Sequence, residues 1–165
     1  MPGPISIGDE APNFDLSSTE DALLMLRDEV TRTAIVVYFF PDPASERALR
    51  DLDALNKGLD SLARRSARVL AVSPAKLDDL RKLQIERKLL FPLLHDDRNF
   101  SAVYGATDPA LVLVSRRQRV LWMANPVASV EEALPQALKA LESIPSGTET
   151  YSKKVINRFI DRWVN

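Results

Sequence analysis

The sequence predicts a single α/β domain whose mixed central sheet carries helices on both faces. The continuous β-rich run at 34–40 is typical of a central strand buried on both faces, and the mostly apolar segment 67–73 predicts a second buried strand. An amphipathic helix pattern separates them, so they should be parallel neighbours joined by a right-handed crossover. The segment "ALVLVSRRQRVLWMA", 110–124, instead indicates two strands around a polar turn. This antiparallel hairpin makes the expected sheet mixed.

The first half of the chain supplies four further elements. "NFDLSS" predicts a short strand, and "STEDALLMLRDEV" predicts a helical turn or short helix with Ser18 or Thr19 as N-cap. Apolar residues spaced by threes and fours from Ser45 to about Arg64 predict one amphipathic helix. "PAKLDDLRKLQIERKL" predicts another helix, with Pro74 in its first turn.

The second half completes the order β-α-β-α-β-β-α. "FPLLHDD" predicts a strand, a short turn follows around "RNFSAVYGA", and the hairpin comes next. "SVEEALPQALKAL" predicts a helix from about Ser129. We therefore expect a mixed sheet of about four or five strands in a three-layer α/β/α sandwich.

The domain is expected to span residues 1–142, because the composition changes after them. "SIPSGTET", 143–150, is a Pro/Gly/Ser/Thr linker, and "YSKKVINRFIDRWVN", 151–165, predicts an amphipathic helical extension. Phe159, Ile160 and Trp163 lie on its apolar stripe and are candidates for partner binding. The stripe must cover its own domain, a second copy in a homodimer, or another protein.

Composition excludes several classes of function. The 165 residues are 45% apolar, enough for one real core, and the net charge of −1 favours neither nucleic acid nor an anionic membrane. No apolar run approaches the roughly 18 residues of a membrane span, and the N-terminus lacks a signal-peptide pattern. We therefore expect a cytoplasmic protein without a membrane span.

The absence of cysteine is the firmest chemical constraint. With no cysteine, this polypeptide has no disulfide, no thiolate metal site, no iron–sulfur cluster and no thiol redox cycle. The single histidine, His95, serves zinc and haem sites poorly, because these usually need several His or Cys ligands. We expect neither a metal nor a cofactor.

Four ordered segments between about Ile7 and Val120 resemble peroxiredoxins of the AhpC/TSA group. They are "IGDEAPNFDLSS", "VVYFFPDPAS", "LAVSPAKLDDLRK" and "FPLLHDDRNFSAVYGA". The second resembles the strand that enters the family's pro-x-x-x-thr-x-x-cys motif. This resemblance implies a thioredoxin-like fold of the peroxiredoxin type and, in the family, a thiol-dependent peroxidase.

Aligned on that motif, the family's proline is Pro41, its threonine is Ser45 and its peroxidatic cysteine is Ala48. The conserved arginine before the hairpin is replaced by Pro109 and Ala110, and Pro109 is a candidate for a cis peptide bond. In the family the thiolate attacks the O–O bond while the arginine and the helix dipole keep it ionised. The resemblance therefore implies a site that has lost its reactive group, with Pro41 and Ser45 left as candidate ligand-binding residues.

Three explanations of Ala48 are open. The preferred one is a naturally degenerate, non-catalytic binding or regulatory module, because the arginine and any resolving cysteine are missing too. The first alternative is an antioxidant peroxidase whose cysteine at position 48 was replaced by alanine in the laboratory. The second is a repurposed enzyme that uses Ser45, although Ser at this position is a preferred helix cap.

Other polar groups have structural interpretations. His95, Asp96 and Asp97 should form a solvated strand end, since three consecutive residues of a strand cannot all face one side. Arg47 can pair with Asp51 at i,i+4. Three arginines of the hairpin turn should be exposed: Arg116, Arg117 and Arg119.

Overall fold

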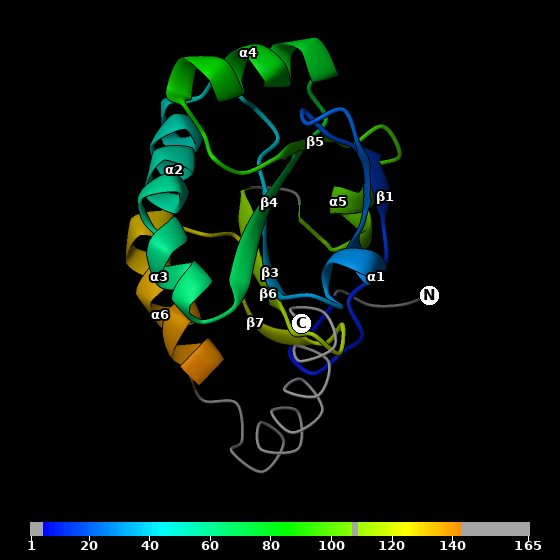
Figure 1. Ribbon diagram of the computed structural model, residues 1–165, viewed down its shortest axis with the longest axis vertical. Coiled ribbons are helices and arrows are strands. Elements are labelled where there is room, and N and C mark those ends of the chain that lie inside the picture. The colour runs from blue at the N-terminus through cyan, green and yellow to red at the C-terminus, as the bar shows by residue number, and fades with distance from the viewer. Residues whose placement is uncertain (1–4, 107–108, 143–165) are drawn as a thin grey trace, which may run out of the picture.

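The computed structural model describes residues 5–106 and 109–142, and their centre is a five-stranded sheet (Figure 1). Its spatial order is β5-β4-β3-β6-β7, a mixed sheet as predicted. The strands span Ala34–Phe39 (β3), Ala67–Ser73 (β4), Leu93–His95 (β5), Ala110–Val114 (β6) and Val120–Ala124 (β7).

Strand β3 lies at the centre, and all six of its residues are buried. It pairs in parallel with β4, from Ala34 opposite Ala67 to Phe39 opposite Val72. On its other side it pairs antiparallel with β6. Burial on both faces explains why its sequence is continuously apolar instead of alternating.

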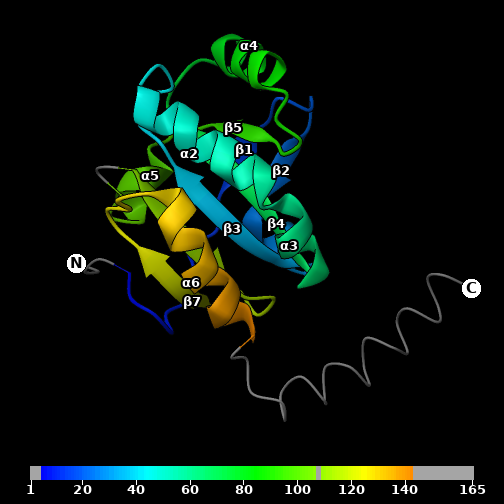
Figure 2. The ribbon, with the colours of Figure 1, turned by 90° about the vertical axis from the view of Figure 1, so that its left-hand side faces the viewer.

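Four helices cover one face of the sheet: α2 (Glu46–Lys57), α3 (Leu59–Arg64), α4 (Leu77–Arg87) and α6 (Val130–Glu142). Figures 1 and 2 show α2, α3 and α6 packed along this face, with α4 at one end. Side chains at alternate positions of β3, including Val36 and Tyr38, form a single core with buried leucines of these helices. This layer also carries the motif residues at the start of α2.

The opposite face is covered by shorter elements, namely β1 (Asp15–Ser17), β2 (Leu23–Met25), α1 (Leu26–Glu29) and α5 (Phe100–Val103). A second core forms here between the remaining β3 side chains, such as Ile35 and Val37, and residues including Phe14 and Tyr104. The sheet therefore lies between two layers, which completes the expected sandwich.

The prediction for residues 18–30 is wrong in its first half. Instead of a helix starting at Ser18 or Thr19, the chain turns and forms β2, which pairs antiparallel with β1. Only α1 is helical, and its N-cap is Met25. Thr19 is held against β5 instead, since its N–H donates to the Leu93 carbonyl and its Oγ1 atom accepts from the Leu93 N–H. Tertiary pairing thus overrides the local capping signal.

The long helix predicted from Ser45 to about Arg64 is two helices. Gly58 separates α2 from α3 and has no side chain where α6 packs closest. A Cβ on Gly58 would lie 2.3 Å from the Leu134 Cδ2 atom. Likewise Pro74 precedes α4, whose N-cap is Lys76, and does not lie in its first turn.

The hairpin β6–β7 and the helix that follows it agree with the predictions. Strands β6 and β7 pair antiparallel around an exposed turn that contains the three arginines. The Asn125–Pro126 bond is cis. The bond into Pro109, for which a cis form was considered, begins at Asp108 and so lies outside the described residues.

The expected linker 143–150 and the helix 151–165, with Phe159, Ile160 and Trp163, also lie outside the described residues. Among the helices in the described part of the chain, none is long and apolar enough to cross a membrane.

Candidate functional site

The motif begins where β3 ends and the chain turns into α2. Pro41 is exposed in this turn. The Asp42 side chain orders the turn, because its Oδ1 atom accepts a hydrogen bond from the Ala44 N–H at 2.9 Å. The Asp42 carbonyl also accepts from the Ser45 N–H. The turn therefore delivers Ser45 in an extended conformation to the first turn of the helix.

Ser45 is the N-cap of α2. Its φ of −70° and ψ of 141° are those of a capping residue, and its Oγ atom accepts a hydrogen bond from the Ala48 N–H at 3.0 Å. No histidine or carboxylate forms a hydrogen bond with the Ser45 hydroxyl within the described residues. The geometry is that of a helix cap, as the sequence predicted for this residue.

Ala48 is buried, with an exposed fraction of 1%. Its methyl group belongs to the core on this face of the sheet, together with Tyr38, Phe40 and Leu52. The position that the motif assigns to a nucleophile therefore contributes apolar packing, and a methyl group has no chemistry to offer a substrate.

Ala110 lies at the same end of the sheet. It is the first residue of β6 and the register partner of Phe39, two residues before Pro41. It is fully buried, and the preceding Pro109 carbonyl accepts a hydrogen bond from the Val127 N–H. The fold thus brings the four motif positions Pro41, Ser45, Ala48 and Ala110 to the carboxyl end of β3, but they present neither a thiol nor a cation.

A buried polar cluster lies directly beneath this end of α2. The Tyr38 hydroxyl donates to Asp51 Oδ2 at 2.8 Å, and the Val130 N–H donates to Asp51 Oδ1 at 3.1 Å. Asp51 is buried, with 4% exposed. One carboxylate therefore joins β3, α2 and the first residue of α6.

Arg47 extends this cluster toward solvent. Its Nε atom lies 3.9 Å from Asp51 Oδ2, which confirms the expected i,i+4 pair at long range. The Nε and Nη2 atoms are buried without a hydrogen-bond acceptor, although 39% of the Arg47 side chain is exposed. Arg47 partly offsets the charge of Asp51 without making a direct hydrogen bond.

The cluster also sets the protonation of Tyr38. Burial raises the pKa of Tyr38 far above its usual value near 10, and the adjacent Asp51 carboxylate raises it further. Burial likewise raises the pKa of Tyr104, whose hydroxyl donates to the Pro12 carbonyl. Both phenols therefore act as neutral hydrogen-bond donors.

The sequence interpretation considers Asp51 only as the partner of Arg47 and assigns Tyr38 no polar contact. A signal was present, because position 51 lies on the same helical face as Ala48, Leu52 and Leu55. A carboxylate within an apolar stripe needs a buried donor, and Tyr38 on the inward side of β3 supplies it.

Comparison with known proteins decides the family. The AhpC/TSA family matches residues 7–131, about three quarters of the chain. The chain belongs to the AhpC/TSA family. Two Mycobacterium tuberculosis proteins from different strains, each carrying the name peroxiredoxin, are 29% identical to it over 100 residues. These 100 residues are 60% of this chain and 63% of each relative, so the chain spans less than two thirds of their length.

Solved structures of other proteins share the fold. Peroxidoxin BcpB from Mycobacterium tuberculosis has a TM-score of 0.78 at 17% identity and covers 84% of this chain and 97% of its own. A cysteine-to-serine mutant of Xylella fastidiosa PrxQ has a TM-score of 0.77 at 19% identity, with 86% and 98% covered. The chain therefore has the thioredoxin-like peroxiredoxin fold, and it lacks the peroxidatic cysteine because it has no cysteine at all.

The histidine of this AhpC/TSA chain is used structurally. The His95 Nδ1 atom lies 2.7 Å from the Ala75 carbonyl, so Nδ1 carries the proton of this hydrogen bond. Asp96 is not solvated as expected, since it is 5% exposed and its carboxylate accepts from the Phe100 and Ser101 N–H groups. It instead orders the start of α5. Within the described residues, His and acidic side chains form no group that could hold a metal.

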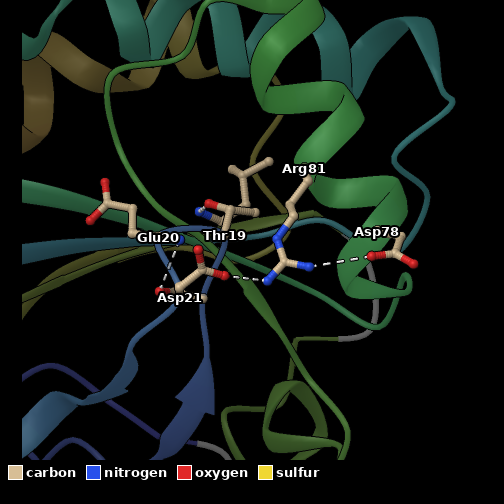
Figure 3. Close-up of polar contacts among 7 residues, drawn as sticks. Thr19, Glu20, Asp21, Asp78 and Arg81 are labelled. Atoms are coloured by element: carbon tan, nitrogen blue, oxygen red, sulfur yellow. Dashed lines mark hydrogen bonds and ion pairs between the residues drawn. The ribbon is translucent and has the colours of Figure 1, made fainter.

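A charged cluster links the β1–β2 turn to α4 (Figure 3). The Arg81 guanidinium lies between Asp21, at 2.6 Å, and Asp78, at 3.3 Å. Beside it, the Thr19 Oγ1 atom accepts from the Leu93 N–H. Asp21 and Asp78 are mostly exposed. These contacts hold the β1–β2 turn against α4 and β5. We assign the cluster a structural role.

Two cavities lie along the outer side of α2. The larger, of about 430 Å³, lies between α2, α3 and α6, and the smaller is lined by Glu46, Leu49, Arg50, Asp53 and Arg87. Neither is lined by Pro41, Ser45 or Ala48.

Proposed function

We propose that this chain is an AhpC/TSA domain without thiol peroxidase activity that serves as a non-catalytic binding or regulatory module. One observation carries the proposal: the motif's cysteine position is Ala48, whose methyl group is buried in the core. Reduction of a hydroperoxide by this family needs a thiolate, and the chain contains none.

The surroundings of Ala48 support a natural loss over a single laboratory replacement. Pro109 and Ala110 occupy the place of the family's arginine, and Ala110 is packed at the start of β6. Replacing one cysteine in the laboratory would leave that arginine in the sequence. The absence of both groups favours a pseudoenzyme, and sequencing the native gene would test this point directly.

The alternative of a Ser45 enzyme has no observation in its favour. A serine nucleophile needs an adjacent general base, whereas the Ser45 Oγ atom accepts the Ala48 N–H as a cap. The only histidine in the sequence, His95, is hydrogen-bonded to the Ala75 carbonyl. We therefore propose that Ser45 stabilises α2 and does not react.

The test is steady-state hydroperoxide reduction by the full chain, with NADPH, thioredoxin reductase and thioredoxin as reductants. A cysteine-containing peroxiredoxin in the same assay is the positive control. The account predicts no consumption above the protein-free blank. Consumption that rises in proportion to the concentration of this chain would overturn the proposal.

The cytoplasmic location and the homodimer stay predictions. Fractionation of native cells tests the first, and sedimentation equilibrium of the full chain tests the second. Neither outcome changes the chemistry available at Ala48.

A further inference from the structure

The larger cavity is a groove on the helical face, between the C-terminal part of α2 and helices α3 and α6. Helices α2 and α6 pack against each other here (Figures 1 and 2). The groove has an apolar floor and a charged rim. The floor consists of Ala54, Leu134, Pro135 and Leu138, and the rim carries Arg50, Asp53, Lys57 and Glu131.

Two of the residues that line the groove lack a side chain or a backbone N–H. Gly58 contributes no side chain where α2 meets α3, so the Leu134 side chain can lie against its backbone. Pro135 lies inside α6 and has no N–H, so it cannot donate to the carbonyl of Glu131 one turn earlier. Both residues line the groove, which has a volume of about 430 Å³.

We propose that this groove binds residues 151–165 of the same chain. The chain continues for 23 residues after Glu142, the last residue of the helix that forms the groove floor. The apolar residues of segment 151–165 recur at helical spacing, which is the pattern of an amphipathic helix that lies in an apolar groove. They are Val155, Ile156, Phe159, Ile160 and Trp163.

The connection is long enough for this docking. Eight linker residues, 143–150, can span about 26 Å when extended. Helix α6 runs about 16 Å from Glu142 back to Glu131, the groove residue nearest its start. The segment can therefore turn back and lie along the groove without straining the linker.

Apolar burial is the main driving force, because charge does not favour docking. The rim carries Arg50 and Lys57 against Asp53 and Glu131, and Asp53 already pairs with Arg87 at 3.1 Å. Residues 151–165 are themselves basic, with four Lys and Arg residues and one Asp. A tethered segment also binds at a high effective concentration, so intramolecular docking competes well against a free partner. The groove is separate from the start of α2, so this proposal can fail without the proposed function failing.

The absence of cysteine permits a clean test. A nitroxide attached to Gln136→Cys sits at a single position, because the chain has no other cysteine. Gln136 is exposed and follows Pro135, but it does not line the groove. In the full chain labelled with nitrogen-15, we expect loss of the amide signals of residues 151–165. The control label is placed on Ala102→Cys, an exposed residue of α5 on the opposite face of the sheet, and should leave those signals intact.

Matched substitutions separate docking from mere tethering. Ile160→Asp adds a charge to the apolar stripe and should restore the signals, whereas Asn157→Asp adds the same charge to the polar side and should not. On the groove, Ala54→Glu should restore them, whereas Ala63→Glu, exposed on α3 outside the groove, should not. The amide spectrum of residues 5–142 in each variant reports whether the domain is folded.

Three results would overturn the proposal. The first is the absence of signal loss with the Gln136→Cys label, and the second is a loss that Ile160→Asp does not reverse. The third is a loss that persists when nitroxide-labelled chains without nitrogen-15 are mixed with nitrogen-15 chains that carry no nitroxide, because the groove would then be filled by a second copy of the chain.

Discussion

Ser45 and Ala48 determine what the start of α2 can do. The hydroxyl of Ser45 satisfies the Ala48 N–H, and the methyl group of Ala48 faces the core. In an AhpC/TSA peroxidase these positions would hold a peroxide and attack it. Here the same local geometry stabilises a helix, since an N-cap is worth about 1 kcal/mol.

Substitution of the cap should lower stability without changing activity. We expect Ser45→Ala to reduce the free energy of unfolding by about 1 kcal/mol, because the Ala48 N–H loses its acceptor. Urea unfolding followed by circular dichroism measures this. Ser45→Asp, which keeps an acceptor at the N-cap, should unfold within a few tenths of a kcal/mol of the native chain. Equal losses for both variants would contradict the capping role.

A thiol restored at position 48 should be unreactive. Ala48 is 1% exposed among apolar neighbours, and burial of this kind raises the pKa of a thiol. We expect the thiol of Ala48→Cys to react with a disulfide reagent at least about tenfold more slowly than that of Ala102→Cys, which is exposed. Similar reaction rates for the two folded variants would show that position 48 is open to the reagent. That result would contradict the packing described here.

Asp51 shows the limit of sequence reasoning at the residue scale. The spacing of Arg47 and Asp51 predicts their pairing, but the stronger contacts of Asp51 come from Tyr38 and Val130, which are distant in sequence. Local spacing cannot reveal partners that only the packing of β3 against α2 and α6 brings together.

At the scale of elements, the sequence predicts the helices and strands whose pattern is set by burial of their side chains in the core. The apolar runs that became β3 and β4, the β6–β7 hairpin and α6 are all recognisable, because a two-sided core requires those patterns. Strand β2 is missed, since its three residues are half-buried or exposed and its identity comes from pairing with β1. The break at Gly58 is missed because it depends on the position of Leu134 in another helix.

The contact at Gly58 gives a prediction at this scale. Gly58→Ala would favour helix by its propensity, and φ at Gly58 is −86°, which alanine adopts freely. The added Cβ would nevertheless lie 2.3 Å from Leu134 Cδ2, so we expect a loss of about 1–3 kcal/mol in stability from overpacking.

A double-mutant cycle isolates that clash. Removing the Leu134 side chain in the Gly58→Ala background should cost less than in the native chain, because the shortened residue no longer meets the new methyl group. Urea unfolding of the four proteins measures the coupling. Strict additivity, or stabilisation by Gly58→Ala alone, would contradict close packing of α6 on the α2–α3 junction.

At the scale of the whole molecule, the two buried tyrosines couple stability to alkaline pH. Their folded pKa values are raised above the ordinary value near 10, so both states hold the proton below about pH 10. Above it the unfolded chain loses these protons while the folded chain keeps them. Stability therefore falls as the pH rises, by about 1.4 kcal/mol per pH unit for each tyrosine that stays neutral only when folded.

Tyr38→Phe tests this assignment. The variant should be less stable at pH 8 by about 1–3 kcal/mol, because buried Asp51 loses a donor. Its free energy of unfolding should then fall less steeply between pH 10 and pH 11 than that of the unsubstituted chain. The difference in slope should be about 1.4 kcal/mol per pH unit, which corresponds to one proton. Urea unfolding at the two pH values measures both effects, and identical slopes would contradict a neutral buried Tyr38.

The whole molecule combines the fold of a peroxidase family with a site that has no reactive group. The order along the chain of the main sheet's strands and the family resemblance could be predicted from sequence, because both depend on apolar patterns and short motifs. The packing of Ala48 and the groove beside Gly58 could not, because they depend on how distant helices meet.

The most direct test of the central claim is a single-turnover measurement with the native full chain in excess over hydrogen peroxide, without any reductant. A peroxidatic thiol would consume one equivalent of peroxide rapidly, whatever its later partners. We predict that the peroxide concentration stays at the level of the protein-free control, apart from slow oxidation of the methionines, which mass spectrometry identifies as sulfoxide. Rapid stoichiometric consumption by the unmodified chain, without methionine sulfoxide, would contradict the account.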